Sequence, residues 1–158
     1  MTDELKKEFT LRITQANPIS MITILYEIAL AYLEEAAEAK QSDDREKFVL
    51  AIHHGQDCIR ELQSSLNLSY EPAPVLYRLY IQMHRKLAQA ITGFSLEACE
   101  KVQSQLEQLR DAYIQLEKTG SWDSVMVNTQ QVYAGYTYGR DDLVETCQNY
   151  DTSRGFLV

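Results

Sequence analysis

Four long stretches of this sequence repeat apolar residues at spacings of three and four, the period of an α-helix that buries one face. Each stretch holds about 20 residues, and short segments containing proline, glycine, serine or aspartate separate them. A helix of that size is about 30 Å long. Short connections make successive helices antiparallel neighbours. The spacing therefore predicts an all-α fold, an up-down antiparallel four-helix bundle.

Residue types that favour helix ends mark the boundaries of these stretches. Asn17, followed by a proline, predicts the start of a first long helix that runs to about residue 40. Asp43 is the expected N-cap of the second helix, because a glutamate follows three residues later. The third helix is expected over residues 74–92, where Gly93 ends it. Ser95 is the expected cap of the fourth.

The same pattern divides the chain into three parts. Residues 1–16 form an N-terminal arm, with a short helix expected over about residues 3–12. Residues 17–118 form the bundle. Residues 119–158 hold several tyrosines and glycines but few aliphatic side chains, so we expect a weakly structured C-terminal extension there.

The charge and the cysteines narrow the class of partner and the compartment. A net charge of -8 makes nucleic acid and anionic membrane surfaces poor partners. No apolar run is long enough to cross a bilayer, and the first residues lack the apolar core of a secretory signal. Cys58 and Cys99 fall on or beside apolar stripes, where we expect buried free thiols. A protein of the reducing cytoplasm is the resulting expectation.

No catalytic or metal-binding pattern accompanies the helices. None of His53, His54 and His84 has an acid three residues before it, so the Glu-x-x-His pattern of di-iron bundles is absent. We therefore expect no enzyme activity, no metal and no cofactor. His53 and His54 leave open a histidine phosphotransfer bundle, although such domains usually place a lysine soon after the reactive histidine and none follows here.

The first long helix holds more apolar side chains than one buried face needs. Met21, Ile24 and Ile28 form a second line on it, and Tyr77 and Ile81 form one on the third helix. The second lines indicate a wider core, a face covered by the N-terminal segment, or a groove for an amphipathic helix or extended peptide. The candidate partner-binding residues are Met21, Ile24, Tyr26, Ile28, Tyr77, Tyr80 and Ile81.

Short blocks along the chain match a known family in order and spacing. The blocks are Asn17-Pro18 with Ile24-Leu25-Tyr26-Glu27, Ile59-Arg60-Glu61-Leu62 with Leu66-Asn67, Leu76-Tyr77-Arg78-Leu79-Tyr80 with Leu87, and Leu109-Arg110-Asp111-Ala112-Tyr113. Over about residues 13–118 the sequence resembles the FliS family, the flagellin-specific chaperones of bacterial flagellar export. Tyr113 replaces a tryptophan of the family pattern.

The resemblance implies a function in protein export. The family is an antiparallel helical bundle that binds the disordered C-terminal segment of new flagellin, prevents its polymerisation and delivers it to the export gate. A helical adaptor for a protein other than flagellin remains an alternative, and a homo-oligomer remains open. In the core, Tyr26 and Tyr80 are expected to keep their hydroxyls at the surface.

Two departures from the family lie at the ends of the chain. Family members often begin with a tyrosine-containing arm, and residues 1–12 hold no tyrosine. The C-terminal extension is also longer than is usual. We hypothesise that Tyr133, Tyr136 and Tyr138 of the extension replace the arm and lie over an apolar groove until flagellin displaces them.

Overall fold

The computed structural model describes residues 1–69 and 71–119, and these residues form five helices and no β-strand. The all-α class predicted from the spacing is confirmed. The extension with Tyr133, Tyr136 and Tyr138 lies outside the described residues. The helices are α1 (Asp3–Gln15), α2 (Pro18–Gln41), α3 (Arg45–Ser64), α4 (Ala73–Gly93) and α5 (Glu97–Thr119).

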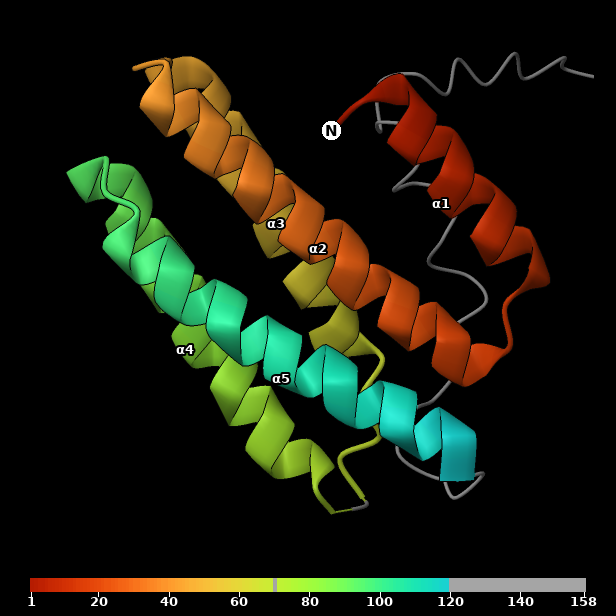
Figure 1. The fold of residues 1–158 in the computed structure, drawn as a ribbon. Coiled ribbons are helices and arrows are strands. Elements are labelled where there is room, and N and C mark those ends of the chain that lie inside the picture. Colours follow the sequence, from red (N-terminus) through yellow and green to blue (C-terminus); the bar gives the residue numbers. More distant parts are fainter. Residues whose placement is uncertain (70, 120–158) are drawn as a thin grey trace, which may run out of the picture.

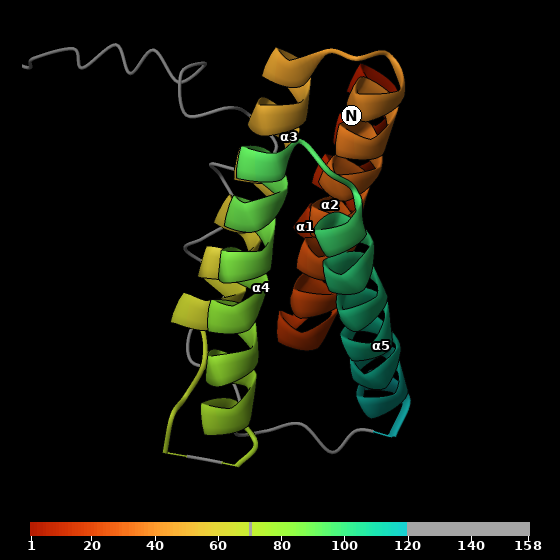
Figure 2. The ribbon, with the colours of Figure 1, turned by 90° about the vertical axis from the view of Figure 1, so that its left-hand side faces the viewer.

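Helices α2 to α5 pack in chain order, and α5 closes the group by packing against α2. The most extensive contact joins α2 and α3. The chain turns back at each connection, so successive helices run in opposite directions (Figure 1). Seen from the side, α3 and α4 lie on one side of the molecule and α2 and α5 on the other (Figure 2). None of the described helices is both long and apolar enough to cross a membrane.

Helix α1 lies outside this group of four and packs along α2 (Figure 1). Only two residues, Ala16 and Asn17, connect it to α2. The sequence predicts a short helix over residues 3–12, and α1 continues past that range to Gln15. Phe9 is its one buried side chain. α1 therefore extends the layer of α2 and does not enter the centre of the bundle.

The helix starts follow local side-chain chemistry. The Asn17 carboxamide oxygen accepts hydrogen bonds from the backbone N–H groups of Ile19 and Ser20, at 3.0 and 2.8 Å, which confirms the predicted cap of α2. At α3 the predicted cap, Asp43, is wrong. Asp44 takes that role and accepts from the N–H of Lys47 at 3.1 Å. Asp43 instead has φ 55 and completes the turn between α2 and α3.

Helix α4 ends in an aromatic contact and not in a glycine turn. Gly93 is its last residue, but Phe94 adopts the left-handed conformation, with φ 45 and ψ 50. The Phe94 ring meets Phe48 edge-on at 5.0 Å between centroids, and the Lys40 ammonium lies 3.6 Å from its centroid. These contacts join the α2–α3 end of the bundle to the α4–α5 end. They offset the steric cost of a non-glycine residue in this conformation.

The core is a single apolar cluster drawn from all five helices. Cys58 and Cys99 are buried free thiols, as the sequence predicts. Burial raises the pKa of both thiols, that of Cys99 to about 11. Both therefore stay protonated at neutral pH and act as small apolar side chains.

Candidate functional site

Helix α2 is apolar on two faces, and both are covered. Tyr26 and Leu33 point into the bundle, where they lie beside Tyr80 and Gly55 respectively. Met21, Ile24 and Ile28 form the second face, and their exposed fractions are 6%, 3% and 1%. The surplus of apolar residues on this helix is thus buried in the free chain. We call these three residues the second face of α2.

Helix α1 packs along α2, and ion pairs hold it near both of its ends. Arg12 and Gln15 of α1 line a small cavity together with Ile24 of the second face. The Met1 ammonium lies 2.6 Å from a Glu35 carboxylate oxygen, and Arg12 Nη1 lies 2.5 Å from Glu27 Oε2. Glu27 and Glu35 bracket Ile28 on α2, so the two pairs place α1 antiparallel to α2 across this part of the helix. Of the three alternatives that the sequence leaves open, the structure supports a wider core, because Met21, Ile24 and Ile28 belong to the same buried cluster as the rest of the core and Phe9 of α1 joins that cluster.

The hold of α1 on α2 is weak by the measure of its contacts. Burial of the Phe9 side chain contributes about 1.5–3 kcal/mol. The hydrogen bond between Arg12 and Glu27 raises the pKa of Arg12. Both side chains are partly exposed, and ion pairs of this kind contribute about 0–1 kcal/mol to stability. An isolated helix of 13 residues is marginal in water. Together with the Met1–Glu35 pair and the partly buried Leu5 and Ile13, these contacts join α1 mainly to α2, so we expect α1 to unfold locally at a lower cost than the four-helix core.

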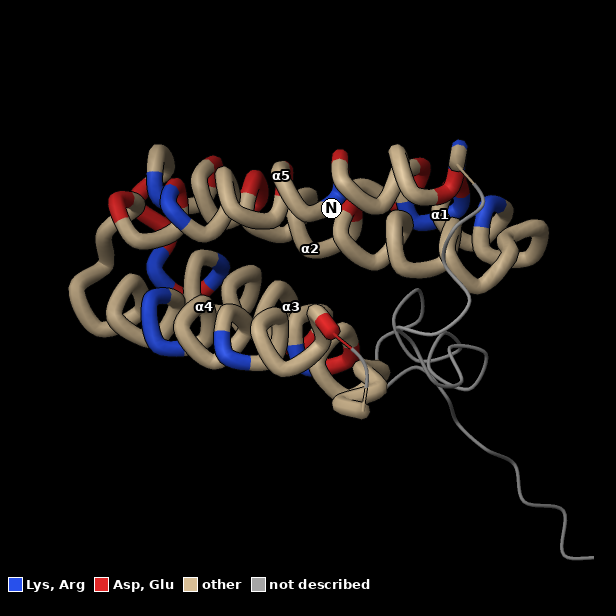
Figure 3. The backbone as a smooth tube through the Cα atoms, turned by 90° about the horizontal axis from the view of Figure 1, so that it is seen from below, with Lys and Arg blue, Asp and Glu red and all other residues tan. Residues whose placement is uncertain are grey.

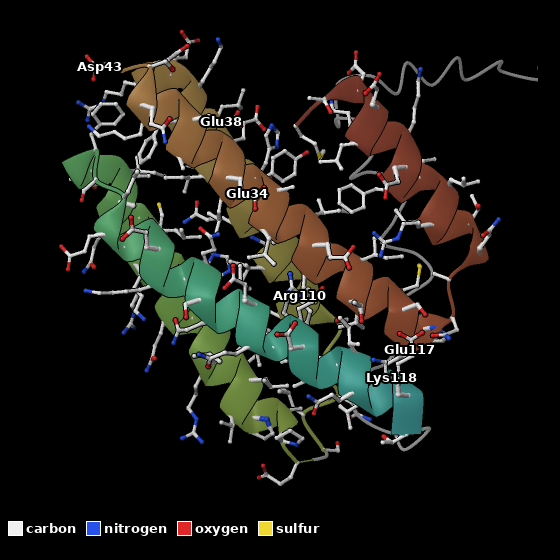
Figure 4. The ribbon with its side chains drawn as sticks, in the orientation of Figure 1. Glu34, Glu38, Asp43, Arg110, Glu117 and Lys118 are labelled. Atoms are coloured by element: carbon white, nitrogen blue, oxygen red, sulfur yellow. The ribbon has the colours of Figure 1, made fainter. Side chains whose placement is uncertain are left out.

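A small cavity opens where α1, α2 and α5 meet. Its volume is about 260 Å³. Glu117, at the end of α5, accepts hydrogen bonds from the Ser20 hydroxyl and from the Asn17 amide, the latter at 3.4 Å (Figure 4). The cavity interrupts the packing between α1, α2 and α5 at the C-terminal end of α1. The lining residues are Arg12, Gln15, Ala16, Ser20, Thr23, Ile24 and Glu117.

Tyr26 and Tyr80 lie at the centre of the bundle with exposed fractions of 0%. Their hydroxyls form a hydrogen bond with each other, and the ring of Tyr113 is 5.5 Å from that of Tyr26. The expectation that these hydroxyls reach the surface is therefore wrong. A partner hydroxyl inside the core removes the need for water. Neither side chain is accessible to a binding partner in this state.

Tyr77 and Ile81 lie apart from the other predicted residues. Tyr77 is exposed and Ile81 is partly exposed on α4, the helix diagonally opposite α2. The seven predicted residues therefore fall into three places. Three lie buried on the second face of α2, two lie at the centre of the bundle, and two lie on the surface of α4.

The histidines lie on the outer sides of α3 and α4. His53 is exposed and its Nδ1 lies 3.1 Å from Gln56 Oε1. The His54 ring stacks on Tyr32 at 4.9 Å between centroids. Burial, and then the charge of Arg60, lower the pKa of His84. The described part of the chain holds no group of three or more His, Cys, Asp or Glu that could hold a metal ion.

Phe9 and the two ion pairs of α1 are functional candidates that the sequence reasoning did not select. A signal was present, because Leu5, Phe9 and Ile13 repeat at spacings of four and define an apolar stripe on the first helix. Leu5 and Ile13 pack beside Phe9 against the core in the structure. The stripe predicts an amphipathic helix, but not which face of the bundle it covers.

Two comparisons with known proteins agree with this architecture. The model of a family described as "Flagellar protein FliS" matches residues 1–120, a range that includes all five helices. A protein of Bacillus subtilis (strain 168) named "Flagellar secretion chaperone FliS" is 28% identical over 103 residues, which cover 65% of this chain and 77% of that protein.

Proposed function

Because the chain belongs to the FliS family, we propose that it is a cytoplasmic chaperone of flagellar export that binds the disordered C-terminal segment of flagellin. The relative from Bacillus subtilis is named a flagellar secretion chaperone, which supports the export role. On this proposal the chain catalyses no reaction. It prevents polymerisation of its client and presents the client to the export gate.

One observation carries the choice of binding surface: α1, a short helix with one fully buried side chain, packs along α2 and beside the second face at Ile24. A disordered client that folds on binding needs an extended apolar track more than a deep pocket. Met21, Ile24 and Ile28 provide such a track, about 10 Å long at the helical rise of 1.5 Å per residue. We place the client helix on this track, where its binding displaces α1.

The energetics favour exchange of α1 for a longer client helix. The side chains of the second face are already apolar and already assembled on a rigid helix, so binding orders only the client. A client that buries more apolar surface than Phe9 and its neighbours gains free energy at about 25 cal/mol per Å². The free energy of the contacts between α1 and α2 is the value that the binding free energy of the client must exceed.

A titration of the full chain with a synthetic C-terminal flagellin segment tests the function. We expect saturable binding by calorimetry and a gain in helicity by circular dichroism. Phe9→Ala weakens the packing of α1, so we expect it to tighten client binding by about tenfold, the equivalent of about 1.4 kcal/mol. Leu11→Ala is the matched control, because Leu11 is 61% exposed on the same helix and its loss leaves that packing intact.

The two possible failures have different meanings. Absence of binding by the unmodified chain and by Phe9→Ala would reject flagellin as the client. Binding that Phe9→Ala leaves unchanged, or weakens, would keep the chaperone function but move the client away from the second face of α2.

A further inference from the structure

Helix α4 differs in charge from every other described helix. The chain has a net charge of -8, yet α4 carries Arg78, Arg85 and Lys86 and no acidic residue. The other four described helices each contain at least three acids. Blue segments, which mark Lys and Arg, are visible along α4 in Figure 3. Helix α4 is therefore the one described helix with a net positive charge, because α1, α3 and α5 carry as many Lys and Arg residues but at least as many acids.

Two of these cations share a surface with apolar side chains. Arg78 and Arg85 are exposed and seven residues apart, so they lie on one side of α4, about 10 Å apart along its axis. Tyr77, Ile81 and Ala88 form a line beside them, at helical spacings of four and seven. Tyr77 is 37% exposed. We call these five residues the α4 face.

The cations of the α4 face are not used to stabilise the fold. Among the ion pairs of residues 1–69 and 71–119, none includes Arg78, Arg85 or Lys86. Lys86 turns toward α5, where it donates a hydrogen bond to Gln105 at 3.0 Å. The two arginines keep their charge and their donors free for another molecule.

Exposed apolar side chains are also frequent in the sequence that leads into the α4 face. Of the five large hydrophobic residues exposed in the described part of the chain, Leu68, Val75 and Tyr77 lie within ten residues of one another. Leu68 and Val75 belong to the loop before α4 and to its first turn. An apolar patch beside unpaired arginines is typical of a protein-binding surface.

We propose that the α4 face docks a partner protein through an acidic amphipathic helix. The partner helix would place apolar side chains on Tyr77 and Ile81 and carboxylates on Arg78 and Arg85. Nucleic acid and anionic lipid are disfavoured, because the acids of the flanking helices repel an extended polyanion. A short helix with acids on one side meets only the local positive field.

This docking goes beyond the proposed client binding, because the two surfaces are separate. The α4 face is open in the free chain, whereas the second face of α2 is buried. α2 and α4 are diagonal in the bundle. A partner on α4 therefore leaves the client face and α1 undisturbed.

The test uses a fluorescent synthetic amphipathic helix of about five turns, with leucines on one stripe and glutamates one heptad apart beside it. A second probe has lysines in place of the glutamates. The double variant Arg78→Glu/Arg85→Glu is compared with Lys101→Glu/Lys118→Glu, which changes the net charge equally on α5. We expect the α4 variant to weaken the acidic probe by at least about tenfold, most strongly at low salt, and the α5 variant by less than about twofold.

Four results would overturn the proposal. The lysine probe binding as tightly as the acidic probe would exclude charge recognition. Equal loss of affinity in both double variants would assign the effect to net charge. Displacement of the probe by the flagellin segment would make the α4 face part of the client site. Self-association of the free chain that Arg78→Glu/Arg85→Glu abolishes would make a second copy the occupant.

Discussion

Tyr26 of α2 and Tyr80 of α4 meet across the centre of the bundle, where their hydroxyls form a hydrogen bond. A buried hydroxyl that loses its partner costs about 1–3 kcal/mol. Each of the two hydroxyls is tolerated in the core because the other is present. The bond also fixes the register of two diagonal helices, since sliding either one separates the pair.

We predict that Tyr80→Phe lowers the free energy of unfolding by about 1–2 kcal/mol, because the Tyr26 hydroxyl is left without its partner. Tyr26→Phe/Tyr80→Phe should cost clearly less than the sum of the two single changes. Urea unfolding followed by circular dichroism measures all three variants. Tyr77→Phe is the control, since Tyr77 is on the surface and should change stability little. Additive costs would show that the two hydroxyls do not depend on each other.

Residue burial was predictable from spacing, but the pairing of polar groups was not. Helical periodicity correctly predicts inward positions for two cysteines and four tyrosines: Cys58, Cys99, Tyr26, Tyr32, Tyr80 and Tyr113. The Tyr26–Tyr80 bond joins positions 54 residues apart, and local spacing contains no information about such a meeting. The same limit explains why three alternatives stayed open for Met21, Ile24 and Ile28 until the packing of the helices was known.

Helix ends were predictable where the cap is local in sequence. Asn17 caps α2 as expected, because the backbone N–H groups that donate to its side-chain oxygen lie within three residues of it. The end of α4 depends on Phe94, whose left-handed conformation is supported by Phe48 and Lys40 from distant parts of the chain. A rule based on glycine at helix ends cannot detect support of that kind.

We predict that α1 opens independently of the bundle. Its one fully buried side chain and its two ion pairs give it a local unfolding free energy of a few kcal/mol, below that of α2 and α3. In native-state hydrogen exchange, the amides of α1 should exchange at least about 100-fold faster than those at the centre of α2. Equal protection of the two helices would show that α1 is an integral part of the cooperative core.

The buried tyrosines make the stability of the whole molecule depend on alkaline pH. Burial raises the pKa of Tyr32 and Tyr113 to about 12, and of Tyr26 and Tyr80 well above the ordinary value near 10. The folded chain therefore keeps protons that the unfolded chain releases. This contribution is complete below about pH 10 and is lost as the pH rises toward the folded pKa values.

We predict that the free energy of unfolding falls by about 1.4 kcal/mol per pH unit for each of these tyrosines above about pH 10. Urea midpoints measured from about pH 8 to pH 11.5 give the slope. Tyr113→Phe should reduce that slope by about 1.4 kcal/mol per pH unit, the contribution of one proton released on unfolding. The same change at the exposed Tyr77 should leave the slope unchanged. An identical slope in both variants would contradict the assignment to buried phenols.

The short connection between α1 and α2 has a consequence for which segments the chaperone accepts. Because only Ala16 and Asn17 join the two helices, α1 competes for its own site at an effective concentration in about the millimolar range. An incoming segment must outcompete this tethered rival before it gains any contact. Short apolar segments of unrelated unfolded proteins bind too weakly to displace α1, whereas a long amphipathic segment binds tightly enough to displace it. On the proposed function, the tether sets an affinity threshold and gives selectivity without recognition of a specific sequence.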